Sequence, residues 1–251
     1  MPPTLHQHKK WIILAICIAI IIVFVVVGYK SAKAPVNTQT TTTPSTIEWP
    51  SEQVKKETIT ESNKAYDITA YYPDTKDDSI TGQLKTFVQG QVDSFKQDMT
   101  DAGPLPDGYP PATFTVSYEE QKNDRADNYI FTTYSDTGGA HGLSSTQTFV
   151  YLKDGTLVTL DDLFTNGTLG IGTVADYVKA ALLKSKVSDA NWISGADPTE
   201  DNYKDFTIDA SGVTFLFDPY QVAPYSSGPQ KVTVPVSVFK TIANPGVFEG
   251  Q

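Results

Sequence analysis

Apolar residues from residue 51 onward recur with two periods, one helical and one extended. Two segments have the helical spacing, in which apolar positions three and four residues apart fall on one face. The first runs from Ile80 to Met99, and the acidic pair Asp77-Asp78 before it suits the positive N-terminal end of a helix dipole. The second runs from Thr173 to Lys186. The pattern therefore predicts two main amphipathic helices.

Shorter segments alternate between apolar and polar positions, which predicts strands. They are Tyr66–Tyr72, Phe114–Tyr118, Tyr129–Tyr134, Thr146–Tyr151, Thr156–Leu160, Phe206–Asp209, Val213–Phe217 and Lys231–Val234. A short helix is expected near Val238–Ile242. Because the helices are set among hairpins and do not alternate with single strands, the expected fold class is α+β. We expect an antiparallel sheet, or sheets, packed with the two main helices.

An uncharged, almost wholly apolar run from Trp11 to Tyr29 precedes this domain. Nineteen residues with a helical rise of about 1.5 Å each span about 28 Å, close to the roughly 30 Å hydrocarbon core of a bilayer. The run is longer than the apolar part of a removable signal peptide, so we expect an uncleaved transmembrane anchor. Cleavage after Ala32-Lys33-Ala34 is the alternative. The expected organisation is a cytoplasmic tail (1–10), the anchor (11–29), a Thr/Pro-rich linker (30–50) and an extracytoplasmic domain (51–251).

The exported part is strongly acidic. All 29 acidic residues follow residue 35, whereas four of the 19 basic residues precede it, so this part has a formal charge of −14. Such a charge excludes a nucleic-acid partner, because binding to a phosphate backbone requires a basic surface. It attracts cationic partners and speeds their approach, although acidity can serve solubility alone. The one cysteine, Cys17, lies in the anchor, so no disulfide is expected in the domain.

Few residues could carry catalysis. His141 is the only histidine outside the N-terminal tail, so a site built on several imidazoles is excluded. No Gly-x-Ser-x-Gly or His-Glu-x-x-His motif is present, and the Ser-x-x-Lys match at Ser237–Lys240 lacks its companion motifs. The carboxylate pairs Glu119-Glu120 and Asp161-Asp162 are expected on the solvated surface. A hydrolase that uses His141 with a carboxylate is the alternative, and no metal or cofactor is expected.

Two loops have the composition of contact surfaces. Gly138-Gly139-Ala140-His141-Gly142 lies between predicted strands, and its glycines permit positive φ and accessible N–H groups beside an imidazole. The second loop, Asp218 to Gly228, holds two Pro-Tyr pairs, in which prolines stiffen the chain and tyrosines supply contact area at low entropy cost. The alternatives are a plain turn and a loop folded onto its own core. The candidate binding residues are Gly138, Gly139, His141, Pro219, Tyr220, Pro224 and Tyr225.

The same loops carry a family resemblance. The segments concerned are Gly138–His141, the hairpin Phe149–Leu163 with Asp161-Asp162-Leu163-Phe164, and Gly212 through Pro219-Tyr220 and Pro224-Tyr225 to Pro235. They resemble the extracytoplasmic domain shared by RsiV-like anti-sigma factors, which sense lysozyme, and PdaC-like peptidoglycan deacetylases. The predicted Tyr66–Pro73 strand and Ile80–Met99 helix are similar to the N-terminal half of that domain.

Two departures limit what the resemblance implies. Only ten residues are expected inside the cell, where an anti-sigma factor has a sigma-binding region, so an anti-sigma role is not expected. A separate catalytic domain like that of the deacetylases is not expected after the shared domain. The resemblance therefore implies a non-catalytic, membrane-anchored module that binds a cell-envelope component or a cationic muramidase such as lysozyme. An envelope hydrolase acting through His141 and a purely structural envelope domain are the alternatives.

Overall fold

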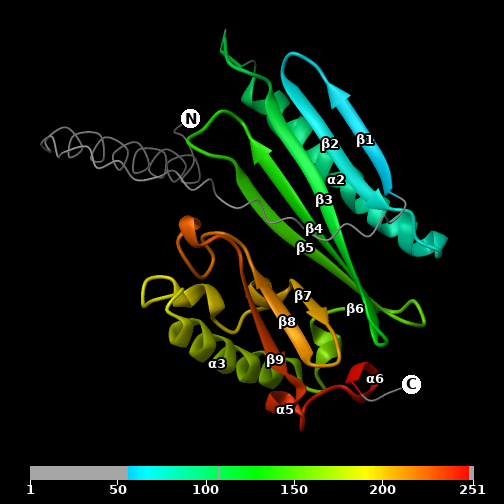
Figure 1. The fold of residues 1–251 in the computed structure, drawn as a ribbon, viewed down its shortest axis with the longest axis vertical. Coiled ribbons are helices and arrows are strands. Elements are labelled where there is room, and N and C mark those ends of the chain that lie inside the picture. Colours follow the sequence, from blue (N-terminus) through cyan, green and yellow to red (C-terminus); the bar gives the residue numbers. More distant parts are fainter. Residues whose placement is uncertain (1–55, 104, 107, 249–251) are drawn as a thin grey trace, which may run out of the picture. The chain divides into compact units, whose positions relative to one another are not determined.

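The first sheet has six strands, which lie side by side in the order of the chain. The computed structural model describes residues 56–103, 105–106 and 108–248. The strands are β1 (Lys56–Ser62), β2 (Tyr66–Pro73), β3 (Ala112–Lys122), β4 (Ala126–Asp136), β5 (Leu143–Leu152) and β6 (Leu157–Val158). Neighbours pair antiparallel except β2 and β3, which are parallel because helix α2 (Asp78–Ala102) carries the chain back between them (Figure 1).

Helix α2 packs its apolar face against this sheet. Its N-cap is Asp77, whose carboxylate accepts the N–H groups of Ser79 and Ile80 at 2.8 and 3.1 Å, donors that the helix itself leaves free. The helix ends at Gly103, whose φ of 80° favours glycine. The side chains buried between helix and sheet include Leu84, Val88, Val92, Ile68, Val116 and Phe131. Burial of each of these side chains stabilises the fold by about 1.5–3 kcal/mol.

The rest of the described chain forms a second sheet with helices around it. Its strands, all antiparallel, are β7 (Phe206–Ile208), β8 (Gly212–Phe217) and β9 (Gln230–Pro235). The helices are η1 (Asp161–Leu163), α3 (Gly167–Ser185), η2 (Ile193–Ala196), α4 (Glu200–Tyr203), η3 (Tyr225–Ser227), α5 (Val236–Phe239) and α6 (Pro245–Phe248). Helix α3 packs against β9 and α5 (Figure 1). The core of this part also contains Val150 and Val158 of the first sheet, so the two sheets share it.

Side chains from the second sheet cap the edge of β5 in the first. Strand β6 pairs with β5 only at Val150 and Tyr151, so the preceding N–H groups on that edge need other partners. Asp218 accepts the N–H of Thr146 at 2.8 Å, and Asp205 accepts the N–H of Thr148 at 2.9 Å. The hydroxyl of Thr148 in turn accepts the N–H of Phe206 at 2.9 Å. Side chains thus take the place of a missing strand.

A second junction joins β4 to β7 through the buried amide of Asn128. Its Oδ1 accepts the N–H of Ile208 at 2.8 Å, and its Nδ2 donates to the carbonyls of Ile208 at 3.1 Å and Gln121 at 2.9 Å. A buried polar group left without partners costs about 1–3 kcal/mol. The bonds of Asn128 therefore specify how the two sheets pack.

The predicted α+β class and both main helices are confirmed, with corrections. Strands β2 and β3 are parallel where antiparallel sheets were expected, because the crossover through α2 returns the chain in the same direction. Helix α3 begins at Gly167 and not at Thr173, because the side chain of Asn166 caps it by accepting the N–H of Leu169 at 3.0 Å. Strand β6 and helix α5 differ in extent from the predicted Thr156–Leu160 and Val238–Ile242, and β1, α4 and α6 were not predicted.

The predicted tail, anchor and linker fall within residues 1–50, which lie outside the described residues. In the part of the chain that the structure describes, no helix is long and apolar enough to cross a bilayer. The described residues all belong to one compact unit.

A pH dependence of stability follows from the junction at Asp205. Burial raises the pKa of Asp205 from 3.8 to about 6, and the negative charge of Asp218 acts in the same direction, against the Thr148 N–H, which lowers it. The folded chain therefore binds this proton more tightly than the unfolded chain, so the free energy of unfolding falls as pH rises from about 4 to about 6. In Asp205→Asn the amide oxygen can still accept the Thr148 N–H, and we expect the decline to shrink by about 1–3 kcal/mol.

Urea unfolding of parent and variant at about pH 4 and about pH 7 measures this difference. Asp98→Asn, which removes an exposed carboxylate of α2, is the matched control. An equal decline in the parent and in Asp205→Asn would contradict the assignment.

Candidate functional site

The two loops singled out in the sequence meet in the folded chain. The first (residues 137–142) joins β4 to β5, and the second (residues 218–229) joins β8 to β9. The ring of His141 stacks on the ring of Tyr225, with centroids 4.1 Å apart and planes inclined by 21°. Nε2 of His141 lies 3.2 Å from the hydroxyl of Tyr220, and the Tyr220 and Tyr225 rings are 5.3 Å apart. Residues 79 positions apart in the sequence thus form one surface.

Hydrogen bonds fix the orientation of His141. Its Nδ1 lies 2.9 Å from the carbonyl oxygen of Gly142. A carbonyl only accepts, so Nδ1 carries a hydrogen, and in the neutral imidazole Nε2 accepts from the hydroxyl of Tyr220. The hydroxyl of Tyr225 donates to the same Gly142 carbonyl at 3.0 Å. The three side chains therefore hold one another in a single arrangement.

Tyr220 occupies a backbone position that normally favours glycine. The N–H of Gln221 donates to the carbonyl of Asp218 at 3.0 Å, which closes a four-residue turn with Pro219 second and Tyr220 third. The φ of Tyr220 is +71°, the value required at the third position of a type II turn. A non-glycine residue with this φ carries strain of about 1–2 kcal/mol, and such strain is concentrated at functional sites.

The side chain of Gln221 ties this turn to the segment before β7. Its Nε2 donates to the carbonyls of Gly195 at 3.1 Å and Asn202 at 3.2 Å, and its Oε1 accepts the N–H of Asp218 at 3.1 Å. The backbone of Gln221 passes so close to residue 195 that only glycine fits there. A Cβ on Gly195 would lie 1.7 Å from the backbone oxygen of Gln221. The turn is therefore held at both ends, by Gln221 and by the bond from Thr146 to Asp218.

A fourth ring extends the surface. The Trp192 and Tyr220 rings are 6.1 Å apart with planes inclined by 28°. We call His141, Trp192, Tyr220 and Tyr225 the aromatic cluster. Sequence analysis missed Trp192, because it lies in a segment without periodicity, where a large aromatic residue among polar neighbours is the only signal.

Other exposed apolar side chains lie beside the first loop. A Cβ on Gly142 would lie 2.3 Å from the ring of Tyr134, and one on Gly138 would lie 3.3 Å from the ring of Tyr109. Leu143, directly after the loop, is 58% exposed, Tyr109 is 55% exposed and Tyr220 is 46% exposed. Exposed apolar residues that gather in one place are typical of binding surfaces.

The predicted site residues have different roles. Ring contacts and hydrogen bonds bring together His141, Tyr220 and Tyr225. Gly138 and Gly139 shape the first loop, with Gly138 at a φ of +84° and its N–H donating to Asp136 at 2.9 Å. Pro219 and Pro224 shape the second loop, in the turn and directly before η3.

The carboxylate pairs considered for catalysis are not arranged as pairs. Glu119 and Glu120 are neighbours on strand β3, so their side chains point to opposite faces of the sheet. Contrary to expectation, the side chain of Glu120 is only 6% exposed, and it forms an ion pair with Lys122. The carboxylate of Asp162 accepts the N–H and the hydroxyl of Thr159 at 2.8 and 2.6 Å, which is a structural role.

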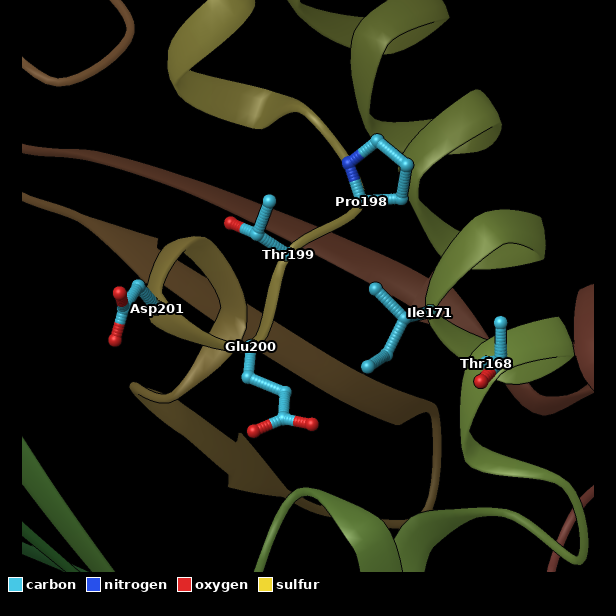
Figure 2. A pocket seen from close by; sticks show the side chains of 6 residues that line it. All are labelled: Thr168, Ile171, Pro198, Thr199, Glu200 and Asp201. Carbon is cyan, nitrogen blue, oxygen red and sulfur yellow. The ribbon is translucent and has the colours of Figure 1, made fainter.

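A pocket of about 370 Å³ lies beside α3 and is separate from the aromatic cluster. Its lining residues are Thr168, Ile171, Pro198, Thr199, Glu200 and Asp201 (Figure 2). A second pocket of about 270 Å³ shares Glu200 and Asp201 and adds Asp161. Asp161, Glu200 and Asp201 are all exposed. Among the described residues, no group of three or more His, Cys, Asp or Glu side chains could hold a metal ion.

Known proteins are similar to most of this chain. Residues 161–237 match the model of a family described as "Protein of unknown function (DUF3298)". The Bacillus subtilis peptidoglycan-N-acetylmuramic acid deacetylase PdaC is 23% identical over 201 residues, which cover 74% of this chain but only 40% of PdaC. The Mycobacterium tuberculosis immunogenic protein MPT64 is 26% identical over 192 residues, which cover 72% of this chain and 79% of MPT64.

Two crystal structures of DUF3298 proteins share the fold. The protein from Pseudomonas aeruginosa has a TM-score of 0.55 at 16% identity, and the matched region covers 80% of this chain and 99% of the Pseudomonas chain. The protein from Bacteroides fragilis has a TM-score of 0.52 at 17% identity, and the matched region covers 78% of this chain and 96% of the Bacteroides chain. The predicted resemblance to PdaC-like proteins is confirmed: residues 161–237 match the DUF3298 model, a family of unknown function, and most of the chain is similar to PdaC and shares its fold with DUF3298 proteins.

Proposed function

We propose that this chain is a non-catalytic, extracytoplasmic binding module. Trp11–Tyr29 anchors it in the membrane with the N-terminus in the cytoplasm, and the aromatic cluster recognises a component of the cell envelope. The observation that carries this proposal is that two loops meet on one surface, where His141 and Tyr220, 79 positions apart in the sequence, are in contact. Tyrosine and tryptophan are the residues that contribute most binding energy in recognition surfaces.

The surroundings of His141 support contact over catalysis. Its Nδ1 is directed to the Gly142 carbonyl and its Nε2 to the Tyr220 hydroxyl, and one face of the ring is stacked on Tyr225. In a catalytic triad the partner of Nδ1 is a carboxylate, which stabilises the imidazolium that forms when Nε2 takes a proton. An imidazole held on both nitrogens by neutral partners suits a fixed contact surface better.

Similarity to PdaC supports the envelope as the place of action. PdaC is named as a deacetylase of N-acetylmuramic acid in peptidoglycan, and the similar region covers 40% of it. A segment shared with a protein that acts on peptidoglycan suits a role in recognising the wall.

We expect the purified full-length chain to sediment with isolated bacterial cell walls. Tyr220→Gly deletes one contact ring and keeps the turn, because glycine readily adopts the positive φ. Loss of one such contact, worth about 1.4 kcal/mol, weakens binding about tenfold. The control is Tyr177→Ala, which removes an exposed ring of α3 outside the cluster and should sediment like the parent. Equal sedimentation of Tyr220→Gly and the parent would exclude the aromatic cluster as the contact surface.

The position of Tyr220 can be tested without touching its ring. A Cβ at Gly195 would collide with the backbone of Gln221, so Gly195→Ala should displace the turn and weaken wall binding as much as Tyr220→Gly does. No atom lies within 4 Å of a Cβ placed on Gly172 in α3. Gly172→Ala should therefore bind normally and gain up to about 1 kcal/mol of stability in thermal unfolding. Normal binding by Gly195→Ala with a normal unfolding temperature would show that the turn is not needed.

The charge favours a second candidate, in which the partner is a cationic muramidase such as lysozyme. A formal charge of −14 after residue 35 steers cationic proteins toward the domain. In this case the chain should slow lysozyme digestion of cell walls, and added salt should weaken the effect because it screens the attraction. Turbidity of a wall suspension measures the digestion rate, with Tyr225→Ala as the variant that loses the stacked ring and Tyr177→Ala as the control. An undiminished digestion rate at excess chain would dismiss this candidate.

A further inference from the structure

The aromatic cluster contains no carboxylate, ammonium or guanidinium group, although the chain as a whole is acidic. It consists of one indole, two phenols and one imidazole, and the groups hydrogen-bonded within it are neutral: the Gly142 carbonyl, the Tyr220 hydroxyl and the Tyr225 hydroxyl. No ion pair involves these four side chains among those of the described residues. A surface of this kind selects its ligand by shape, stacking and neutral hydrogen bonds.

The rings of the cluster are moderately tilted relative to one another. The planes of His141 and Tyr220 are inclined by 31°, those of Tyr220 and Tyr225 by 32°, and those of Trp192 and Tyr220 by 28°. The hydrogen bond between Tyr220 and His141 joins these two rings, whose centroids are 6.2 Å apart. Both side chains are exposed. They therefore present two linked rings inclined by 31°, with the ring of Tyr225 stacked on that of His141. We call the rings of His141 and Tyr220 the platform.

Flat aromatic platforms suit the flat faces of sugar rings. The π face of an aromatic ring is electron-rich and attracts the partly positive C–H groups of a pyranose. In a β-linked chain of such sugars the bulky groups are equatorial, so each ring presents a face of axial C–H bonds. The hydroxyl of Tyr220, at the edge of the platform, can accept or donate a hydrogen bond to a sugar hydroxyl or acetamido group.

Charge narrows the class of sugar. A strongly acidic chain repels anionic polymers, whereas it exerts no net force on an uncharged one. An acetamido group adds a methyl group, which would suit the exposed apolar side chains of Tyr134 and Leu143 next to the first loop.

We propose that the aromatic cluster binds an uncharged β-linked chain of N-acetylated amino sugars, with one sugar stacked on Tyr220 and His141. This proposal rests on the proposed function, because it names the ligand of the same surface. The turn of Asp218–Gln221 holds the Tyr220 ring in place, and Trp192 lies beside the bound chain.

Trp192 makes the proposal measurable. The chain has three tryptophans, of which the other two are Trp11 and Trp49. In the full-length chain with Trp11→Phe and Trp49→Phe, emission comes from Trp192 alone. The chain is kept in a detergent without a sugar headgroup and titrated with oligomers of N-acetylglucosamine. We expect a saturable change in emission whose midpoint is the same at low and high salt.

Variants assign the response to the platform. Tyr220→Gly should weaken the affinity about tenfold. Tyr220→Phe keeps the ring and loses only the hydroxyl, so its affinity should fall by less than that of Tyr220→Gly. Tyr177→Ala should equal the parent. Calorimetry with the same oligomers provides an affinity that does not depend on the emission of Trp192, whose neighbour is altered in the Tyr220 variants.

The possible failures are distinct. No response to the oligomers, in a chain that still sediments with cell walls, would overturn the sugar assignment and leave the proposed function standing. A response to a proline-rich peptide and not to the oligomers would overturn it in favour of a peptide ligand. Equal affinity of Tyr220→Gly and the parent would remove the platform from binding. Loss of both sugar and wall binding by the parent chain would end both proposals.

Discussion

Hydrogen bonds from side chains of one element to the backbone of another join the two sheets of this domain. Asp205 and Asp218 accept N–H groups at the edge of β5, and Asn128 pairs with both backbone groups of Ile208. An open strand edge is a place where another chain can add, so the capping of β5 also protects this edge. Asp218 is the residue at which the second loop leaves β8. The bond that joins the sheets therefore also places the aromatic cluster.

The sequence predicted correctly those helices and strands whose apolar spacing and capping residues lie within one segment of the chain. Helix α2 was found because its apolar spacing and its cap at Asp77 lie within one segment. The start of α3 was missed because its first turns contain Gly167, Gly170 and Gly172, which have low helix propensity. The Asn166 cap and the burial of the helix outweigh that propensity. The parallel pairing of β2 and β3 depends on where α2 packs, and no period within either strand contains that information.

The candidate site was predictable in its parts but not in its assembly. Composition singled out His141 and the second loop independently, and their contact across 79 residues depends on the tertiary junction. The buried roles of Asp205 and Glu120 were not predictable either, because acidic residues in a sequence are expected on the surface. The acidic charge and the aromatic cluster differ in reach: charge acts over about a Debye length, roughly 8–10 Å, whereas stacking on the rings requires contact.

The left-handed backbone of Tyr220 has a consequence for how quickly and how tightly a ligand can be held. The strained turn is formed without a ligand. Pro219, the side-chain bonds of Gln221 and the hydrogen bond from the Thr146 N–H to Asp218 already hold it. A surface that needs no rearrangement loses little conformational entropy on association. Encounter is then not slowed by a folding step, and differences in affinity among related ligands are expressed mainly in how long each stays bound.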